Sequence, residues 1–223
     1  MLSNSSIQEL AVDQIYELRF RAQTEFRAEM WKVLCKDFFQ KYIPKDATVL
    51  EVAAGYCEFI NNIEAKRKIA VDINEETTRR ANENVEVILS ISSDLSAVAT
   101  DSVDRIFMSN FLEHITRDEI TQTLKECLRV LKPKGQLLIL QPNIRFVGHD
   151  YWMFFDHITP IDDRALVEVL EVVGYKLKLN IPRFLPYTTN SSLPKSVFLV
   201  KLYLMIPLAW KFLGGQAFVV AEK

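Results

Sequence analysis

Two stretches decide the fold: residues 49–58, VLEVAAGYCE, and residues 71–74, VDIN. Each is a short apolar run that turns polar at its end, as expected of a buried strand that enters a loop. In a doubly wound sheet, the loop at the carboxyl end of the first strand binds the ligand. Asp72 follows Glu51 by about twenty residues, the spacing at which a carboxylate accepts hydrogen bonds from ribose hydroxyls. These stretches therefore predict a nucleoside site.

Short apolar runs alternate with polar, helix-like stretches along most of the chain. We expect strands at 48–53, 69–73, 85–91, 103–109, 136–141, 175–181 and 216–221, and helices at 57–64, 75–82, 117–131 and 162–173. Strands that are apolar on both faces and separated by helices form a parallel sheet covered on both sides. The sequence therefore predicts a doubly wound α/β fold.

Local signals mark several boundaries. Pro44 ends a helical stripe of apolar residues that begins near residue 13, which predicts a helical cap over residues 1–46. Gly135 stands in a turn where a positive φ is cheap. Asp162 is a predicted N-cap, and Gly174 a predicted C′ residue, of the helix between them.

The composition limits the class of protein. The chain has 223 residues, 49% of them hydrophobic and 25% charged, which excludes a disordered chain. Its three cysteines form no C-x-x-C motif, so neither a disulfide framework nor a zinc ribbon is indicated, and a cytoplasmic location fits best. Residues 1–12 show no signal-peptide pattern.

The charge is uneven along the chain. The net charge is −2, but residues 175–223 contain seven Lys or Arg against Glu222 alone. This pattern does not indicate duplex nucleic acid, and we expect no nucleic-acid partner. It favours an anionic substrate or an anionic membrane surface, although a solvated basic rim is the plainer interpretation.

The loop after the first strand argues against a dinucleotide. Pyrophosphate binding needs a G-x-G-x-x-G loop, and here Gly55 is the only glycine in the corresponding stretch. A sulfonium nucleoside has no phosphate and requires carboxylates or carbonyls near a positive centre. Glu51, at the end of the strand, supplies such a carboxylate.

On these residues the chain resembles the class I S-adenosylmethionine (SAM)-dependent methyltransferases, in the group that includes the ubiquinone-biosynthesis-like and type 11 domains. The resemblance covers roughly residues 47–142 and includes 104–115, DRIFMSNFLEHI, and 131–137, LKPKGQL. Ala53 and Cys57 stand where the family's first motif has glycines. The resemblance implies a Rossmann-like sheet of seven strands, mostly parallel with an antiparallel last strand, in a methyltransferase domain over residues 47–223.

The resemblance also implies SAM as the cofactor and a set of cofactor-binding residues. Asp72 would bind the ribose, Ile73 would pack on the adenine, and Asp94 would meet the adenine amino group. The remaining expected cofactor contacts are Glu51, Ala53, Gly55, Asn110 and Phe111.

Residues 142–160 follow the fifth strand and are rich in aromatic, Asp and His residues, which predicts an acceptor loop. We expect His157 or His149 to act as a base, with Asp156 orienting it; alternatively, these side chains only stabilise the loop. Expected substrate contacts are Arg145, Tyr151, Trp152, Arg183 and Tyr187. His114 is expected to shape the cofactor pocket. The three histidines lack zinc-motif spacing, so we expect no metal.

An insertion over residues 182–213 precedes the last strand and contains the apolar segment 197–213, which is too short and charged for a transmembrane helix. Three interpretations stay open: a helix that covers the acceptor pocket, a homodimer contact, or an interfacial helix that meets a lipid-linked acceptor peripherally at the membrane. The tail also resembles methyltransferases of bacterial polysaccharide assembly.

These observations predict a SAM-dependent methyltransferase acting on an oxygen or nitrogen of a small molecule or sugar. The alternatives are an NAD-dependent oxidoreductase or epimerase, and a catalytically silent cofactor-binding protein. The single loop glycine and the absence of a Y-x-x-x-K motif count against the oxidoreductase.

Overall fold

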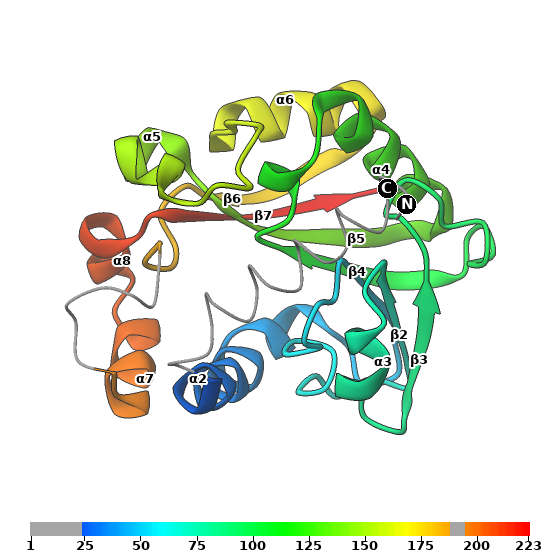
Figure 1. The fold of residues 1–223 in the computed structure, drawn as a ribbon, viewed down its shortest axis with the longest axis horizontal. Coiled ribbons are helices and arrows are strands. Elements are labelled where there is room, and N and C mark those ends of the chain that lie inside the picture. The colour runs from blue at the N-terminus through cyan, green and yellow to red at the C-terminus, as the bar shows by residue number, and fades with distance from the viewer. Residues whose placement is uncertain (1–23, 188–194) are drawn as a thin grey trace, which may run out of the picture.

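A seven-stranded sheet runs through the middle of the protein, with helices on both of its faces (Figure 1). The computed structural model describes residues 24–187 and 195–223. The strands are β1 (Thr48–Val52), β2 (Arg67–Asp72), β3 (Val85–Leu89), β4 (Val103–Ser109), β5 (Leu131–Pro142), β6 (Lys176–Ile181) and β7 (Gln216–Glu222).

The strand order is β3-β2-β1-β4-β5-β7-β6. The pairs from β3 to β5 are parallel, whereas β7 runs antiparallel to both β5 and β6. The order reverses direction between β1 and β4, and ligands bind at such a switch point, beyond the carboxyl ends of the strands. The predicted fold class, with its antiparallel last strand, is confirmed.

Alternating side chains of the buried strands supply two separate cores. In β1, Val49 belongs to the core under α2 (Thr24–Asp37) and the 3-10 helix η1 (Phe39–Tyr42), and Leu50 to the opposite core. Helices α4 (Arg117–Val130) and α6 (Asp163–Val173) cover that opposite face (Figure 1). Burial on both faces explains why these strands are continuous apolar runs.

The two helices on this second face have the ends expected of their residues. Thr116 and Glu119 form a capping box at the start of α4. The Asp162 side chain accepts hydrogen bonds from the backbone N–H groups of Arg164 and Ala165, both at 2.9 Å. At the other end of α6, Gly174 has a φ of 116°, so both predicted boundaries of α6 are confirmed.

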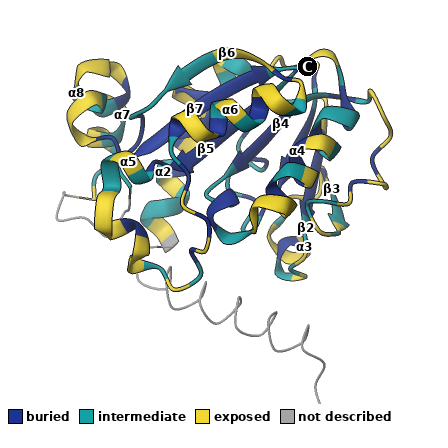
Figure 2. Cartoon of the chain, turned by 90° about the horizontal axis from the view of Figure 1, so that it is seen from above, coloured by how far each residue is buried: buried dark blue, intermediate teal, exposed yellow. Residues whose placement is uncertain are grey.

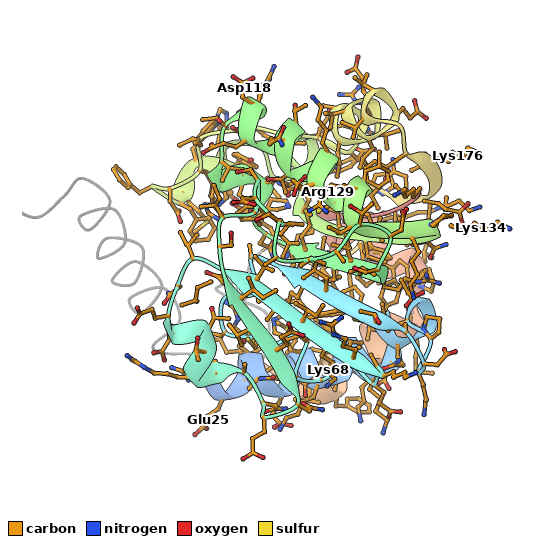
Figure 3. The ribbon with its side chains drawn as sticks, turned by 90° about the vertical axis from the view of Figure 1, so that its right-hand side faces the viewer. Glu25, Lys68, Asp118, Arg129, Lys134 and Lys176 are labelled. Atoms are coloured by element: carbon orange, nitrogen blue, oxygen red, sulfur yellow. The ribbon has the colours of Figure 1, made fainter. Side chains whose placement is uncertain are left out.

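Arg129, near the end of α4, ties the connection between β3 and β4 to the helix (Figure 3). Its guanidinium pairs with Glu126 at 2.8 Å and donates hydrogen bonds to the carbonyls of Leu95 and Val98. This connection includes Asp94, one of the expected cofactor residues, which is exposed to solvent.

Two local predictions were wrong. Residues 57–64 form a series of turns rather than a regular helix, because Cys57 has a φ of 58° and the Ile60 N–H donates to the Glu51 side chain. In the turn before the paired part of β5, Lys134 rather than Gly135 has the positive φ, at 66°. Gly135 is needed for close approach, since a Cβ there would lie 2.8 Å from the Lys132 carbonyl oxygen.

The predicted N-terminal cap and the insertion lie against each other. The described part of the cap is α2 and η1, whereas residues 1–23 lie outside the described residues. The apolar segment of the insertion forms α7 (Val197–Met205) and α8 (Pro207–Leu213), with Pro207 at the first position of α8. Helix α7 packs against α2, and the outer surfaces of α7 and α8 are largely exposed (Figure 2).

The cap of α6 gives a direct test of the local energetics. We expect Asp162→Ala to lower the free energy of unfolding by about 1 kcal/mol, because two backbone donors lose their acceptor. Asp162→Asn keeps a side-chain acceptor and should lower it by a few tenths of a kcal/mol. Urea unfolding measures both values, and equal losses for Ala and Asn would contradict the capping role.

Candidate functional site

The loop after β1 contains three residues with left-handed backbone conformation. The φ angles are 54° at Ala53, 49° at Gly55 and 58° at Cys57. The alternating positive φ angles lie at the positions where the resembled family has glycine. Ala53 and Cys57 therefore adopt a conformation that is cheap for glycine and strained for other residues.

Asp72, at the end of β2, holds this loop in place. Its carboxylate accepts hydrogen bonds from the Gly55 N–H at 2.7 Å and from the Asn74 N–H at 2.9 Å. Thr77 adds a hydrogen bond from its hydroxyl to the Gly55 carbonyl at 2.8 Å. Asp72 is thus a neighbour of the loop, as the spacing predicted, and also one of its supports.

Glu51 lies beneath the loop, at the end of β1. Its side chain is buried, and its Oε2 accepts a hydrogen bond from the Ile60 N–H at 2.9 Å. Burial raises the pKa of Glu51 well above its usual value, and the nearby Glu58 carboxylate acts in the same direction. A positive centre at the cavity wall would favour the ionised form of this carboxyl.

A cavity of about 470 Å³ begins at this loop and runs between α2 and α7. One wall contains loop residues together with Asn110 from the end of β4, and another contains His157 and Tyr187 from the later segments. The apolar side chains that line it include Met30, Trp31 and Leu34 of α2 and Leu199, Val200 and Leu202 of α7. The cavity therefore joins the cofactor loop to a largely apolar chamber.

The charged groups around the cavity are mainly acidic. Among the residues that the structure describes, Glu51, Glu58 and Glu113 line it together with the cations Arg27 and Lys195. Arg27 pairs with Glu58 at 2.6 Å, which neutralises both partners. The remaining carboxylates favour a ligand with a positive centre at the loop end of the cavity.

Glu113, His114 and His157 form a cluster at the cavity wall. Glu113 Oε1 lies 3.8 Å from His114 Nε2 and 4.0 Å from His157 Nε2. Two backbone N–H groups, from Ile158 and Thr159, donate to the Glu113 carbonyl and fix the loop against this residue. Burial raises the pKa of the Glu113 carboxyl, an effect opposed by His114.

The structure separates the expected site residues into two groups. Those that line the cavity are Glu51, Ala53, Gly55, Asn110, His157 and Tyr187. The other expected cofactor residues lie outside the cavity lining, at the last residue of β2 and on the connections that follow β2, β3 and β4: Asp72, Ile73, Asp94 and Phe111. Ile73 is 49% exposed, so it presents an apolar surface beside Asp72.

Among the expected catalytic residues, His157 alone lines the cavity. His149 lies exposed on the 3-10 helix η3 (Gly148–Met153) and does not line it. Asp156 contacts the ring of His114, with Oδ2 at 3.2 Å and the backbone oxygen at 3.1 Å from Nδ1. The orienting role expected for Asp156 therefore concerns His114 in this structure.

Several expected substrate residues have structural contacts instead. The buried Tyr151 donates its hydroxyl hydrogen bond to the Thr159 carbonyl at 2.5 Å. Arg183 donates to the carbonyls of Gly214 and Phe212 and so anchors the end of α8. The remaining two residues do not line the cavity either: Arg145 pairs with Asp163, and Trp152 is half-exposed.

The residues present fit SAM. The left-handed loop lets a ligand come close to its backbone, and the carboxylates of Glu51 and Asp72 lie beside the loop. These carboxylates would repel a pyrophosphate, whereas they would stabilise a sulfonium. The donor set therefore agrees with a positively charged nucleoside.

Comparisons with known proteins agree with this geometry. Residues 50–139 match the model of the family described as methyltransferase domain. A SAM-dependent methyltransferase from Archaeoglobus fulgidus is 20% identical, with 92% of this chain and 99% of that chain covered and a TM-score of 0.67. A SAM-dependent methyltransferase from Thermotoga maritima is 18% identical, with 98% of each chain covered and a TM-score of 0.67.

The fold is also found with another activity. The cyclase SpnF is 16% identical, with 87% of this chain and 80% of that chain covered and a TM-score of 0.61. No curated protein matches the chain in sequence.

Residues 50–139 thus match a methyltransferase domain, and the chain has the fold of the SAM-dependent methyltransferases. No helix in the described parts of the chain is long and apolar enough to cross a membrane.

Sequence reasoning missed part of the cavity wall. Glu113 had been assigned no role, although it directly precedes His114 in the stretch that follows the fourth strand. Met30, Leu199 and Tyr203 were also missed, because helices α2 and α7 are far apart in the sequence and meet only in the folded chain.

The left-handed loop is tested by changing Ala53. A β-branched residue in this conformation costs roughly 1–2 kcal/mol, so Ala53→Val should weaken SAM binding by about tenfold or more. Ala53→Gly removes the strain and should keep the affinity within about threefold of the unchanged protein. Calorimetric titration with SAM, and with NAD as the negative ligand, measures this; tight binding by Ala53→Val would contradict the loop geometry.

Proposed function

We propose that the protein transfers the methyl group of SAM to an oxygen or nitrogen of an amphiphilic acceptor. The observation that carries this proposal is the cavity, which continues from the left-handed loop at Gly55 to His157 and the apolar wall of α7. Cofactor and acceptor can meet end to end in such a space. Methyl transfer is an in-line displacement, so holding the two reactants in line is the main catalytic requirement.

The loop end of the cavity would hold the cofactor. When bound, SAM supplies an electrophilic methyl group on a positively charged sulfur. Asp72 would bind the ribose hydroxyls from beside the loop, and the exposed side chain of Ile73 would pack on the adenine. Glu51 lies where its carboxylate attracts the positive centre.

The other end of the cavity would hold the acceptor. The reacting atom would lie near His157, and an apolar chain would lie between α2 and α7, against Trp31 and Leu199. Transfer to a hydroxyl requires that its proton be removed, a step that a positioned side chain accelerates. The Glu113, His114 and His157 cluster supplies the polar groups at this end.

The surface of α7 and α8 suggests the acceptor's class. Phe198, Met205 and Phe212 are each more than 70% exposed there, and residues 176–221 contain no Asp or Glu. Lys201 and Lys211 lie on the same two helices. An exposed apolar surface with basic side chains fits an anionic amphiphile, such as a lipid-linked sugar, that is presented at a membrane surface.

A second candidate function is cofactor binding without methyl transfer. The similarity to the cyclase SpnF favours considering it, because that protein has this fold and a different activity. The two candidates differ in whether the methyl group leaves the cofactor.

Transfer of a labelled methyl group from SAM distinguishes them. We expect label in the lipid fraction of a cell extract treated with the unchanged protein, and in that treated with His149→Ala. His157→Ala should lower the rate by about 10²-fold or more while SAM affinity changes little, because His157 lies at the acceptor end. Label in no fraction would favour the second candidate, and full turnover by His157→Ala would remove this histidine from the reaction.

The surface of α7 and α8 is tested with vesicles. We expect the protein to co-sediment with vesicles of phosphatidylcholine and phosphatidylglycerol, and the binding to weaken as salt is added. The double change Phe198→Asp and Phe212→Asp should abolish the binding. Val172→Asp, at a position 80% exposed on α6, is the matched control. Binding that Val172→Asp lowers equally, or no binding at all, would contradict a membrane-presented acceptor.

A further inference from the structure

The cluster of Glu113, His114 and His157 has the arrangement of a metal site, and we propose that it binds one divalent cation of the zinc class. One nitrogen of each ring and one carboxylate oxygen lie within 4.8 Å of one another. In tetrahedral zinc sites, bonds of about 2.1 Å place neighbouring ligand atoms about 3.4 Å apart. The separations from Glu113 Oε1 to the two Nε2 atoms, 3.8 and 4.0 Å, exceed this by about half an ångström, and no pair in the cluster is wider than 4.8 Å. Binding therefore requires the side chains to rotate inward by about an ångström.

Asp156 gives the second observation. Both its carboxylate and its backbone oxygen lie within 3.2 Å of His114 Nδ1. Two oxygen atoms favour a proton on Nδ1, which leaves the lone pair on Nε2, the ring nitrogen that lies 3.8 Å from Glu113 Oε1. A carboxylate that holds the outer nitrogen of a histidine is the usual support of a metal-binding imidazole.

Glu113 provides the third observation. It is 1% exposed, and its Oε2 has no hydrogen-bond partner among the described residues. A buried polar oxygen without a partner is costly. A cation bound by this carboxyl group and the two imidazole nitrogens would supply the missing partner.

The donor set and the open side of the cluster indicate the kind of cation and site. Two imidazoles and one carboxylate are ligands of catalytic zinc, and the cavity borders all three residues. Three protein ligands with one side open leave a coordination position for water or an acceptor oxygen. The sequence had indicated no metal, because His114 and His157 are separated by 43 residues and meet only through the loop after β5.

The role of the cation rests on the proposed function, although its binding does not. An acceptor hydroxyl bound to the cation has a lowered pKa and gives its proton to water. The oxygen then forms a bond to the methyl carbon while the carbon–sulfur bond breaks, and the electron pair of that bond stays on sulfur. In this arrangement His157 is a ligand, so the activity loss expected for His157→Ala would come from loss of the cation.

Cobalt is a suitable probe for the site because it adopts zinc geometries and is coloured. After treatment with a chelator and its removal, the protein should take up one equivalent of Co²⁺ with visible absorption typical of four or five ligands, and Zn²⁺ should displace it. His157→Ala and Glu113→Gln should each weaken uptake by about 100-fold or more, and Asp156→Asn by about 10- to 100-fold. His149→Ala, which removes the histidine outside the cluster, should bind as the unchanged protein does.

The titrations use no SAM and no acceptor, so they separate the two proposals. Thermal unfolding of each variant shows whether it is folded; if Glu113→Gln is not, His157→Ala and Asp156→Asn decide. Absence of Co²⁺ and Zn²⁺ uptake by the unchanged protein, or uptake by the folded His157→Ala variant equal to that of His149→Ala, would overturn the metal site and leave methyl transfer standing. Stoichiometric uptake by a protein that transfers no methyl group would overturn the proposed function alone.

Discussion

The hydrogen bond from the Gly55 N–H to the Asp72 carboxylate is the contact on which the site depends. It joins the ends of two neighbouring parallel strands, and it holds a loop in which three residues adopt left-handed backbone. Two of those residues are not glycine, so the surrounding contacts must compensate their strain. The burial of Cys57 and its contact with the Thr77 carbonyl contribute to that compensation.

The same loop lies at one end of the cavity, and the two ends differ in chemistry. Its acidic surroundings suit a positively charged cofactor, and the space beyond it is enclosed by aromatic and aliphatic side chains of two helices. Helix α2 comes from before the sheet in sequence, and α7 comes from just before the last strand. The protein thus uses the segments added around a common core to shape the region where an acceptor would bind, consistent with the general division between fold and function.

The structure also changes the interpretation of individual residues. Asp156 and His157 are neighbours in sequence, which suggested that they form a pair. In the structure, Asp156 contacts His114, whereas His157 lies beside Glu113. Arg183 suggested an anion contact by its charge, but its donors are occupied by carbonyls at the end of α8. The residue types in the loop after β5 indicated polar contacts there. Which residue each side chain contacts depends on the direction of the backbone.

The sequence by itself determined the sheet, most of its helices and the position of the cofactor loop, because buried parallel strands and helix caps depend on local patterns of a few residues. It also predicted that Glu51, Gly55 and Asp72 belong to one site, since their spacing follows from the strands. Only the tertiary structure decided which side chains face the cavity. The Glu113, His114 and His157 cluster and the wall made by α2 and α7 join segments remote in sequence, and no local pattern encodes such contacts.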